Sequence, residues 1–413
     1  MSINEVILWI LMICMALGAI DRAIGNRFGL GEKFEDGFNA MGPLALSMVG
    51  VYALSPILAK ILRPVIGPVY NALGADPAMF AGTLLANDMG GWPLAQAMTD
   101  DPQIQKLSGL VLGAMMGATI VFTIPVALGI TQKEDRQFLS RGVLAGIVTI
   151  PLGVITSGLI AGIGLGTVLR NTVPILIVAV AIALGLYFKP EAMTRGFELF
   201  GKGLVFMISI GLGLGVFETM TGHQILTGEW ALLPVAEGFA TVALIAMALA
   251  GAFPAVHLIV KFGSKPLSAA GRLLGVNDTA AGGFIATLAN NIAMFEIMKK
   301  MDARGKILNC AFAVSAAFAL GDHLGFTAGV MPDMIAAVIV GKLVAGITAV
   351  VVAYLLFARA FPAYLAGDEG QLATVGAGPD MTGNPSPAGA RADDVISPHG
   401  PAVETPDPGK PEA

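Results

Sequence analysis

Eleven predominantly apolar stretches of roughly membrane-spanning length run through this chain of 413 residues and restrict what it can fold into. They are residues 3–20, 39–62, 78–98, 107–130, 142–166, 172–188, 203–221, 232–260, 279–298, 307–327 and 332–358. A helix needs about 20 residues to cross a bilayer. Charged residues make up only 13% of the chain, whereas a soluble domain has about 25%. We therefore predict an all-α, polytopic integral membrane protein.

The sequence gives no sign of a signal peptide, a disulfide or metal site, or an enzyme motif. The first basic residue, Arg22, follows the first apolar stretch, so we expect a retained helix there rather than a signal peptide. Cys14 and Cys310 both lie within apolar stretches, which predicts small buried side chains and no disulfide or metal site. No phosphate-binding loop, nucleophile motif or metal cluster occurs. The sequence therefore predicts neither an enzyme nor a cofactor, and no nucleic-acid partner.

The end of the chain differs in composition from the rest. From Asp368 onward eight acidic residues accompany two basic ones, so this region carries −6 while the remainder carries +1. It is rich in Pro, Gly and Ala and lacks the apolar content to fold alone. We predict that residues 367–413 form a disordered acidic tail.

Two apolar stretches contain nearly the same polar signature. The first reads TLLANDMGGWPLAQAM over residues 83–98, and the second reads ATLANNIAMFEIMKKM over residues 286–301. Broken apolar segments at matching places in two halves of a chain are typical of transporter binding sites. Free backbone groups at membrane depth are tolerated only where protein or a water-filled path satisfies them.

The distribution of Lys and Arg favours one topology. If the third and ninth stretches dip into the membrane and return, seventeen basic residues fall on one side, and the other side keeps only Lys60, Arg63, Lys106 and Arg170. If all eleven stretches cross, neither side is favoured. By the positive-inside rule, the N-terminus is outside and the tail is cytoplasmic.

This topology makes the chain an inverted repeat. Five crossings separate the two broken segments. Because this number is odd, the second broken segment enters the membrane from the side opposite to the first. We therefore predict about nine crossing helices and two re-entrant segments in a 5+1+5 arrangement. The first repeat is 1–171, the linking helix is 172–188, and the second repeat is 189–366.

The first broken segment holds the strongest candidates for substrate binding. Asp88 is an acid at membrane depth, next to Asn87 and to a pair of glycines that free the backbone to turn. Ionisable residues in such positions are functional candidates by default. Asp88 could bind an ammonium group; alternatively it caps a half-helix or pairs with Lys342. The indole of Trp92 could pack against an ammonium or lie at the membrane interface.

The second broken segment offers amides in the corresponding position. Asn290 and Asn291 have donors and acceptors for a hydroxyl or an ion. Alternatively they satisfy the interrupted backbone.

Three further ionisable residues are candidates for coupling or gating. Asp322 and His323 are adjacent near one end of their stretch, where they could couple transport to protons or form a surface polar pair. Lys342 lies about ten residues into the last stretch, which puts it ~15 Å deep at 1.5 Å per residue. A buried lysine needs a carboxylate, and Asp322 or Asp88 is the expected partner. The coupling ion is left open.

Four motifs resemble the ethanolamine-utilisation permease family, EutH. They are FNAMGPLAL (38–46), DPAMFAGTLLANDMGG (76–91), GVLAGIVTIP (142–151) and NCAFAVSAAFALGDHLGF (309–326), and the likeness extends from residue 1 to about 358. The resemblance implies a bacterial inner-membrane protein that admits ethanolamine for catabolism. Ethanolamine at neutral pH is mostly an ammonium ion with one hydroxyl, so a carboxylate with amides is the minimal site.

Other functions remain open from the sequence alone. The chain could be a secondary transporter or channel for another small amine or solute, coupled to sodium or protons. An intramembrane enzyme using Asp88 and His323, or a membrane sensor, has no supporting motif.

Overall fold

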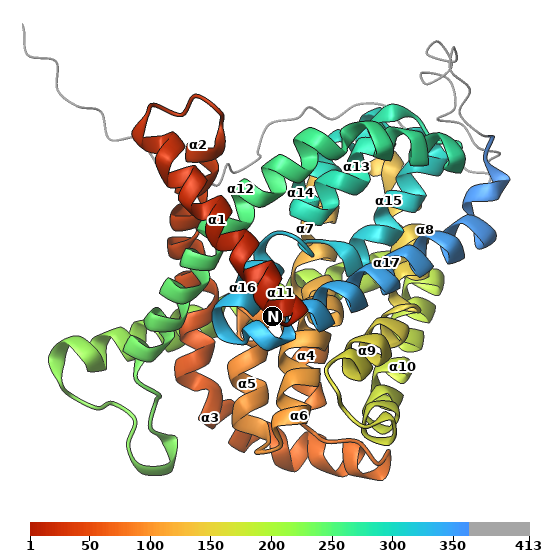
Figure 1. The fold of residues 1–413 in the computed structure, drawn as a ribbon. Coiled ribbons are helices and arrows are strands. Elements are labelled where there is room, and N and C mark those ends of the chain that lie inside the picture. Colours follow the sequence, from red (N-terminus) through yellow and green to blue (C-terminus); the bar gives the residue numbers. More distant parts are fainter. Residues whose placement is uncertain (363–413) are drawn as a thin grey trace, which may run out of the picture. The chain divides into compact units, whose positions relative to one another are not determined.

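The structure is a computed structural model that describes residues 1–362, apart from the side chains of residues 190 and 263–272. The predicted tail lies outside the described residues. The described part is all-α, as predicted (Figure 1). Its first half comprises α1 (Ile3–Ala23), α2 (Leu30–Asn39), α3 (Met41–Ala72), α4 (Met79–Leu84), α5 (Gly91–Met98), α6 (Pro102–Gln105), α7 (Ile124–Ile130), α8 (Arg136–Ile147) and α9 (Ile150–Ile160). After α10 (Leu165–Phe188) follow α11 (Pro190–Thr221), α12 (Val235–Leu274), α13 (Asp278–Ala289), α14 (Asn291–Ile297), α15 (Ala303–Ala316), α16 (Asp322–Val330) and α17 (Ile335–Leu356).

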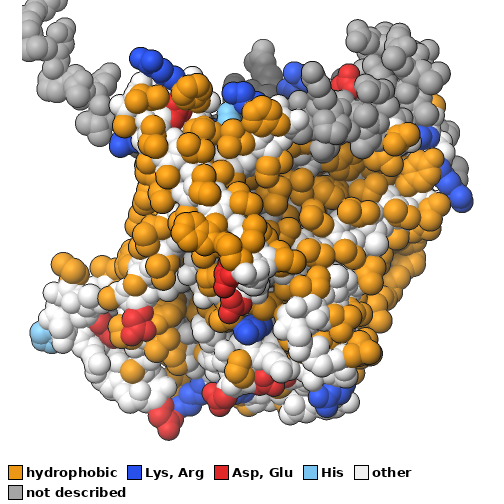
Figure 2. Space-filling view, in the orientation of Figure 1, with side chains coloured by type: hydrophobic (Ala, Val, Ile, Leu, Met, Phe, Trp, Pro, Cys, Tyr) orange, Lys and Arg blue, Asp and Glu red, His pale blue; other side chains and the backbone are white. Residues whose placement is uncertain are grey.

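Eight helical segments of the described residues are long and apolar enough to cross a membrane. Hydrophobic side chains cover the broad middle of the face in Figure 2, and charged side chains gather in its lower part and along its upper edge. The stretch at 307–327, which we expected to cross without interruption, is instead divided between α15 and α16. In the described residues the chain is thus a multi-pass membrane protein in which the stretch 307–327 is interrupted in addition to the two signature segments.

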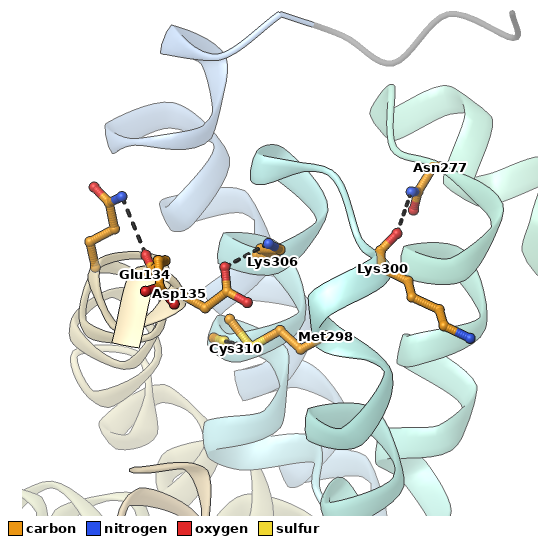
Figure 3. Close-up of polar contacts among 8 residues, drawn as sticks. Glu134, Asp135, Asn277, Met298, Lys300, Lys306 and Cys310 are labelled. Atoms are coloured by element: carbon orange, nitrogen blue, oxygen red, sulfur yellow. Dashed lines mark hydrogen bonds and ion pairs between the residues drawn. The ribbon is translucent and has the colours of Figure 1, made fainter. Parts of the chain in front are cut away.

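Both segments with the polar signature return to the side from which they enter. Thr99 Oγ1 donates a hydrogen bond to Asp76 Oδ2 (3.1 Å), which joins the two ends of the first segment. At the second segment the Asn277 N–H donates to Asp302 Oδ1 (2.9 Å), and Asn277 Nδ2 donates to the Lys300 carbonyl (2.9 Å; Figure 3). In Figure 1, α4 and α5 lie in the lower part of the view, and α13 and α14 in the upper part.

Close contacts recur between helices that the predicted repeat would make equivalent. A Cβ atom at Gly50 in α3 would lie 1.9 Å from the carbonyl oxygen of Ile208 in α11. A Cβ atom at Gly251, 201 positions after Gly50, would lie 2.3 Å from the Leu11 carbonyl oxygen in α1. Helix α3 therefore packs closely against α11, and α12 packs closely against α1.

The two re-entrant segments are fixed by equivalent hydrogen bonds. Ser108 Oγ donates to the Ala78 carbonyl (2.6 Å), and Asn309, 201 positions later, donates from Nδ2 to the Ala280 carbonyl (2.9 Å). An inverted repeat predicts such pairs. The 5+1+5 division itself stays a prediction.

A line of glycines packs the first re-entrant segment against the following helix, which is a π-helix, η2 (Lys106–Gly117). Cβ atoms at Gly109, Gly113 and Gly117 would approach within 2.8 Å of Trp92, 2.9 Å of Asn87 and 2.0 Å of Leu85, respectively. Small residues at this spacing allow the backbones to come close in lipid.

A buried ion pair joins the two halves at the other end of the molecule. Lys306 Nζ in α15 lies 2.6 Å from Asp135 Oδ1, just before α8, and both side chains are largely buried (Figure 3). Cys310 Sγ lies 3.8 Å from Met298 Sδ nearby. Cys14 and Cys310 are both free and buried, as predicted.

Candidate functional site

Asp88 lies at the tip of the first re-entrant segment. The chain becomes extended at Leu85, forms the short helix η1 (Asn87–Met89), and turns at Gly90, whose φ of 97° favours glycine. A Cβ atom at Gly90 would also lie 2.3 Å from a methyl carbon of Val51. The paired glycines therefore let the tip approach α3 while Asp88 remains at the end of the turn.

A second interruption, between α15 and α16, faces this tip. The N–H groups of Phe318 and Leu320 donate to the carbonyls of Thr287 (3.1 Å) and Leu288 (2.9 Å) at the end of α13. Phe318 has a φ of 61°, which is uncommon for a bulky residue and is found where a structure holds strain at a functional site. The interruption thus depends on the second re-entrant segment, and it positions Asp322 and His323 at the start of α16.

The two interruptions enclose a small cavity of about 40 Å³. Its lining combines carboxylates, an imidazole and two aromatic rings: Ala86, Asp88, Met89, Ala118, Phe122, Phe318, Asp322 and His323. The sequence treated Asp322 and His323 as a possible surface pair, but His323 is buried and both residues line this cavity.

The cavity is suited to a small cation. Asp88 Oδ1 and His323 Nδ1 are buried and have no hydrogen-bond partner among the described residues. The rings of Phe122 and Phe318 meet edge to face with centroids 5.4 Å apart. Carboxylates and aromatic faces both attract ammonium groups. An unpaired carboxylate oxygen is costly to bury, so its exposure to a cavity is a functional signal.

Lys342 belongs to α17, and only 1% of its surface is exposed. The ion pair that we expected with Asp88 or Asp322 is not formed: among the described residues, Lys342 Nζ donates to the Ala114 carbonyl. Ala114 belongs to the π-helix η2, and π-helical segments occur frequently at functional sites. Ala114 is next to Gly113, which packs against Asn87, and four residues before Ala118, which lines the cavity.

The remaining candidates of the first segment lie beside the cavity and do not line it. Asn87 is fully buried, and neither atom of its amide has a partner among the described residues. Trp92 is buried in α5 and packs against Gly109. The interfacial alternative for Trp92 is therefore not supported, and its direct contact with a substrate is untested.

The two asparagines of the second segment have local partners. Asn290 Oδ1 accepts from the Ile292 N–H (2.8 Å) and caps α14. Asn291 Nδ2 donates to Thr123 Oγ1 (3.0 Å), while its Oδ1 has no partner among the described residues. These hydrogen bonds agree with the alternative in which the two amides support the interrupted helix.

A larger cavity of about 590 Å³ opens between α3 and α5. It is lined by Tyr52, Ser55, Pro56, Ala59, Lys60, Arg63, Pro93, Gln96, Ala97 and Leu233. Lys60 pairs with Glu229 at its edge, and Arg63 Nη2 donates to the Ala97 carbonyl (2.8 Å). Helix α5 thus connects this open cavity with the segment tip that carries Asp88.

Sequence reasoning missed the aromatic side of the small cavity. Phe122 and Phe318 lie within apolar stretches, where a phenylalanine gives no signal of its own. The available clue was the polar run Gly321-Asp322-His323 inside an apolar stretch, which indicates an interruption of the helix.

Comparison with known proteins assigns the chain to a known group. A family model described as "Ethanolamine utilisation protein, EutH" matches residues 3–356. A Listeria monocytogenes protein named "Probable ethanolamine permease EutH" is 58% identical over 352 residues, covering 85% of this chain and 94% of the relative. A Salmonella typhimurium protein of the same name is 50% identical over 391 residues, covering 86% and 96%. A Bacillus subtilis relative, "Uncharacterized protein YxeR", is 48% identical over 349 residues, covering 84% and 94%. No solved structure matches.

Proposed function

The chain belongs to the ethanolamine utilisation protein EutH family, and on that premise we propose that it transports ethanolamine, as the ammonium ion, into the cell. Relatives are named permeases, which move a solute and are not enzymes. The proposal includes a bacterial inner-membrane location with the N-terminus outside, and a supply of ethanolamine to its catabolism.

The observation that supports this function is the cavity shared by Asp88, Asp322 and His323 at two facing helix interruptions. We assign the ammonium to the Asp88 carboxylate, with the rings of Phe122 and Phe318 against its methylene groups. We assign the hydroxyl to His323, whose Nδ1 has no partner among the described residues. Asn87, Asn290, Asn291 and Trp92 support the turn around the site in this proposal.

The cavity volume favours a very small solute. A buried water needs about 10–15 Å³, so a cavity of about 40 Å³ accommodates about three water-sized groups. Ethanolamine consists of one nitrogen, two carbons and one oxygen, which approaches this size. We propose that the solute enters through the larger cavity between α3 and α5, because α5 belongs to the re-entrant segment that carries Asp88.

Uptake of labelled ethanolamine into proteoliposomes tests the function. We expect saturable uptake by the unmodified protein and loss of it in Asp88→Asn, because the amide keeps the shape of the side chain but loses its charge. A control, Asp36→Asn, removes a partly exposed acid that pairs with Lys33 in α2 and should leave uptake intact. Equal uptake by Asp88→Asn and the unmodified protein would show that the ammonium binds elsewhere.

A second candidate, a transporter of another small amine, is separated from the first by competition. Choline carries three additional methyl groups, which the small cavity does not accommodate. We expect unlabelled ethanolamine, but not choline, to reduce labelled uptake. Stronger competition by choline than by ethanolamine would favour the other substrate class.

A further inference from the structure

Three ionisable side chains line the small cavity, and a fourth, Lys342, is hydrogen-bonded to the helix that contributes Ala118 to the lining. Asp88, Asp322 and His323 line it, and the ammonium of Lys342 donates to the carbonyl of Ala114, four residues before Ala118 of the lining. With both carboxyl groups and Lys342 ionised and the imidazole neutral, these four side chains carry a charge of −1. Among the described residues, no other cation pairs with Asp88 or Asp322.

A net charge at membrane depth is costly, because the surrounding protein and lipid screen it poorly. The entry of one monovalent cation makes this group neutral. A neutral amine would leave one negative charge, and an ammonium accompanied by sodium would leave one positive charge. The number of fixed charges therefore selects both the charge of the substrate and the absence of a second ion.

Lys342 is held in this arrangement by the fold. Its side chain is fully enclosed, and its acceptor belongs to a π-helix that packs against the segment carrying Asp88. An apolar side chain would avoid the cost of burying an ammonium, and replacing buried charges by apolar groups is often neutral or stabilising. The hydrogen bond to the Ala114 carbonyl gives Lys342 a structural contact, but that contact alone does not require a charged side chain.

We infer that Lys342 is a fixed internal cation that limits the site to one monovalent organic ammonium, so that each ethanolamine enters without a co-transported sodium ion and carries one net positive charge. This inference rests on the proposed function. The loaded site crosses as a neutral group, and the empty site returns with its charge of −1.

The first test uses the unmodified protein in proteoliposomes, in mildly alkaline buffer where imidazole is neutral. We expect ethanolamine uptake without sodium, acceleration by a potential that is negative inside, and one charge moved per labelled molecule. Absence of uptake would contradict the proposed function. Uptake that requires sodium, or that moves no net charge because a proton returns on the empty site, would overturn the inference and leave the function standing.

The second test changes the fixed charge. Lys342→Met keeps the length of the side chain but leaves the site at −2, so ethanolamine alone no longer neutralises it. We expect sodium-free uptake to fall by about 100-fold, as the cost of one uncompensated charge at membrane depth predicts. Added sodium or acid should restore part of this uptake. The matched control, Lys342→Arg, retains the charge and should stay independent of sodium.

A compensating variant distinguishes charge from packing. Asp322→Asn combined with Lys342→Met returns the site to −1, and we expect it to regain sodium-independent uptake relative to Lys342→Met alone. A lost packing contact would not be repaired by Asp322→Asn. If Lys342→Met transports without sodium at the rate of the unmodified protein, or if the double variant acquires a sodium requirement, the inference is wrong.

Discussion

At the scale of single residues, the amides and the carboxylate of the two matching signatures have different surroundings. Asn290 uses its Oδ1 to cap α14, whereas Asp88 Oδ1 has no partner among the described residues and borders the cavity. A polar group that satisfies the backbone is already used, and an unsatisfied one remains available for a ligand. Asp88 and Asn290 belong to similar sequence signatures, but of the two side-chain oxygens only Asp88 Oδ1 is free, among the described residues, to accept a hydrogen bond from a ligand.

Asn290→Ala provides a test of this difference. The variant loses the cap of α14, which should lower the free energy of unfolding by about 1 kcal/mol, measured by thermal unfolding in detergent. We expect ethanolamine uptake per folded molecule to remain. Loss of uptake without loss of stability would show that Asn290 contacts the substrate, as one reading of the sequence suggested.

At the scale of helices, glycines determine where the two halves can cross. Gly50 faces the Ile208 carbonyl and Gly251 faces the Leu11 carbonyl, so the first and second long helices of opposite halves meet at their backbones. Backbone contact of this kind maximises packing in lipid, where no hydrophobic effect drives helices together.

Gly50→Ala should therefore destabilise the protein. The added Cβ atom would lie 1.9 Å from the Ile208 carbonyl oxygen, and such overpacking costs about 1–3 kcal/mol. Gly42→Ala in the same helix is the control, because no atom lies within 4 Å of its new Cβ position. We expect a lower unfolding temperature for Gly50→Ala alone. Equal temperatures for the two variants would contradict this packing.

At the scale of the whole molecule, the predicted topology is open to a direct test. Lys106 follows the first re-entrant segment, and Lys133 follows the next long helical segment, Pro102–Ile130. If that segment crosses, Lys106→Cys and Lys133→Cys should react with a membrane-impermeant maleimide from opposite sides, Lys106→Cys from outside. The native Cys14 and Cys310 are buried and should give little background. Labelling of both positions from one side would contradict the topology.

The sequence predicted the membrane class and the two signature segments, and it indicated Asp88 as a candidate for binding, because each of these depends on local composition. Length and hydropathy indicate crossing helices, and an acid beside paired glycines in an apolar stretch has few structural explanations. The sequence also identified Asp322, His323 and Lys342 as unusual at membrane depth. It could not identify their partners, because partners come from other helices.

Only the tertiary structure decided that α15 and α16 are separate helices and that Phe122 and Phe318 complete the cavity. The interruption is held by carbonyls of α13, which are distant in sequence, and phenylalanine in an apolar stretch gives no local signal. The acceptor of Lys342 likewise depends on a π-helical carbonyl that folding brings to it. Hydropathy is local and can be read along a chain, whereas the pairing of buried polar groups depends on which helices meet.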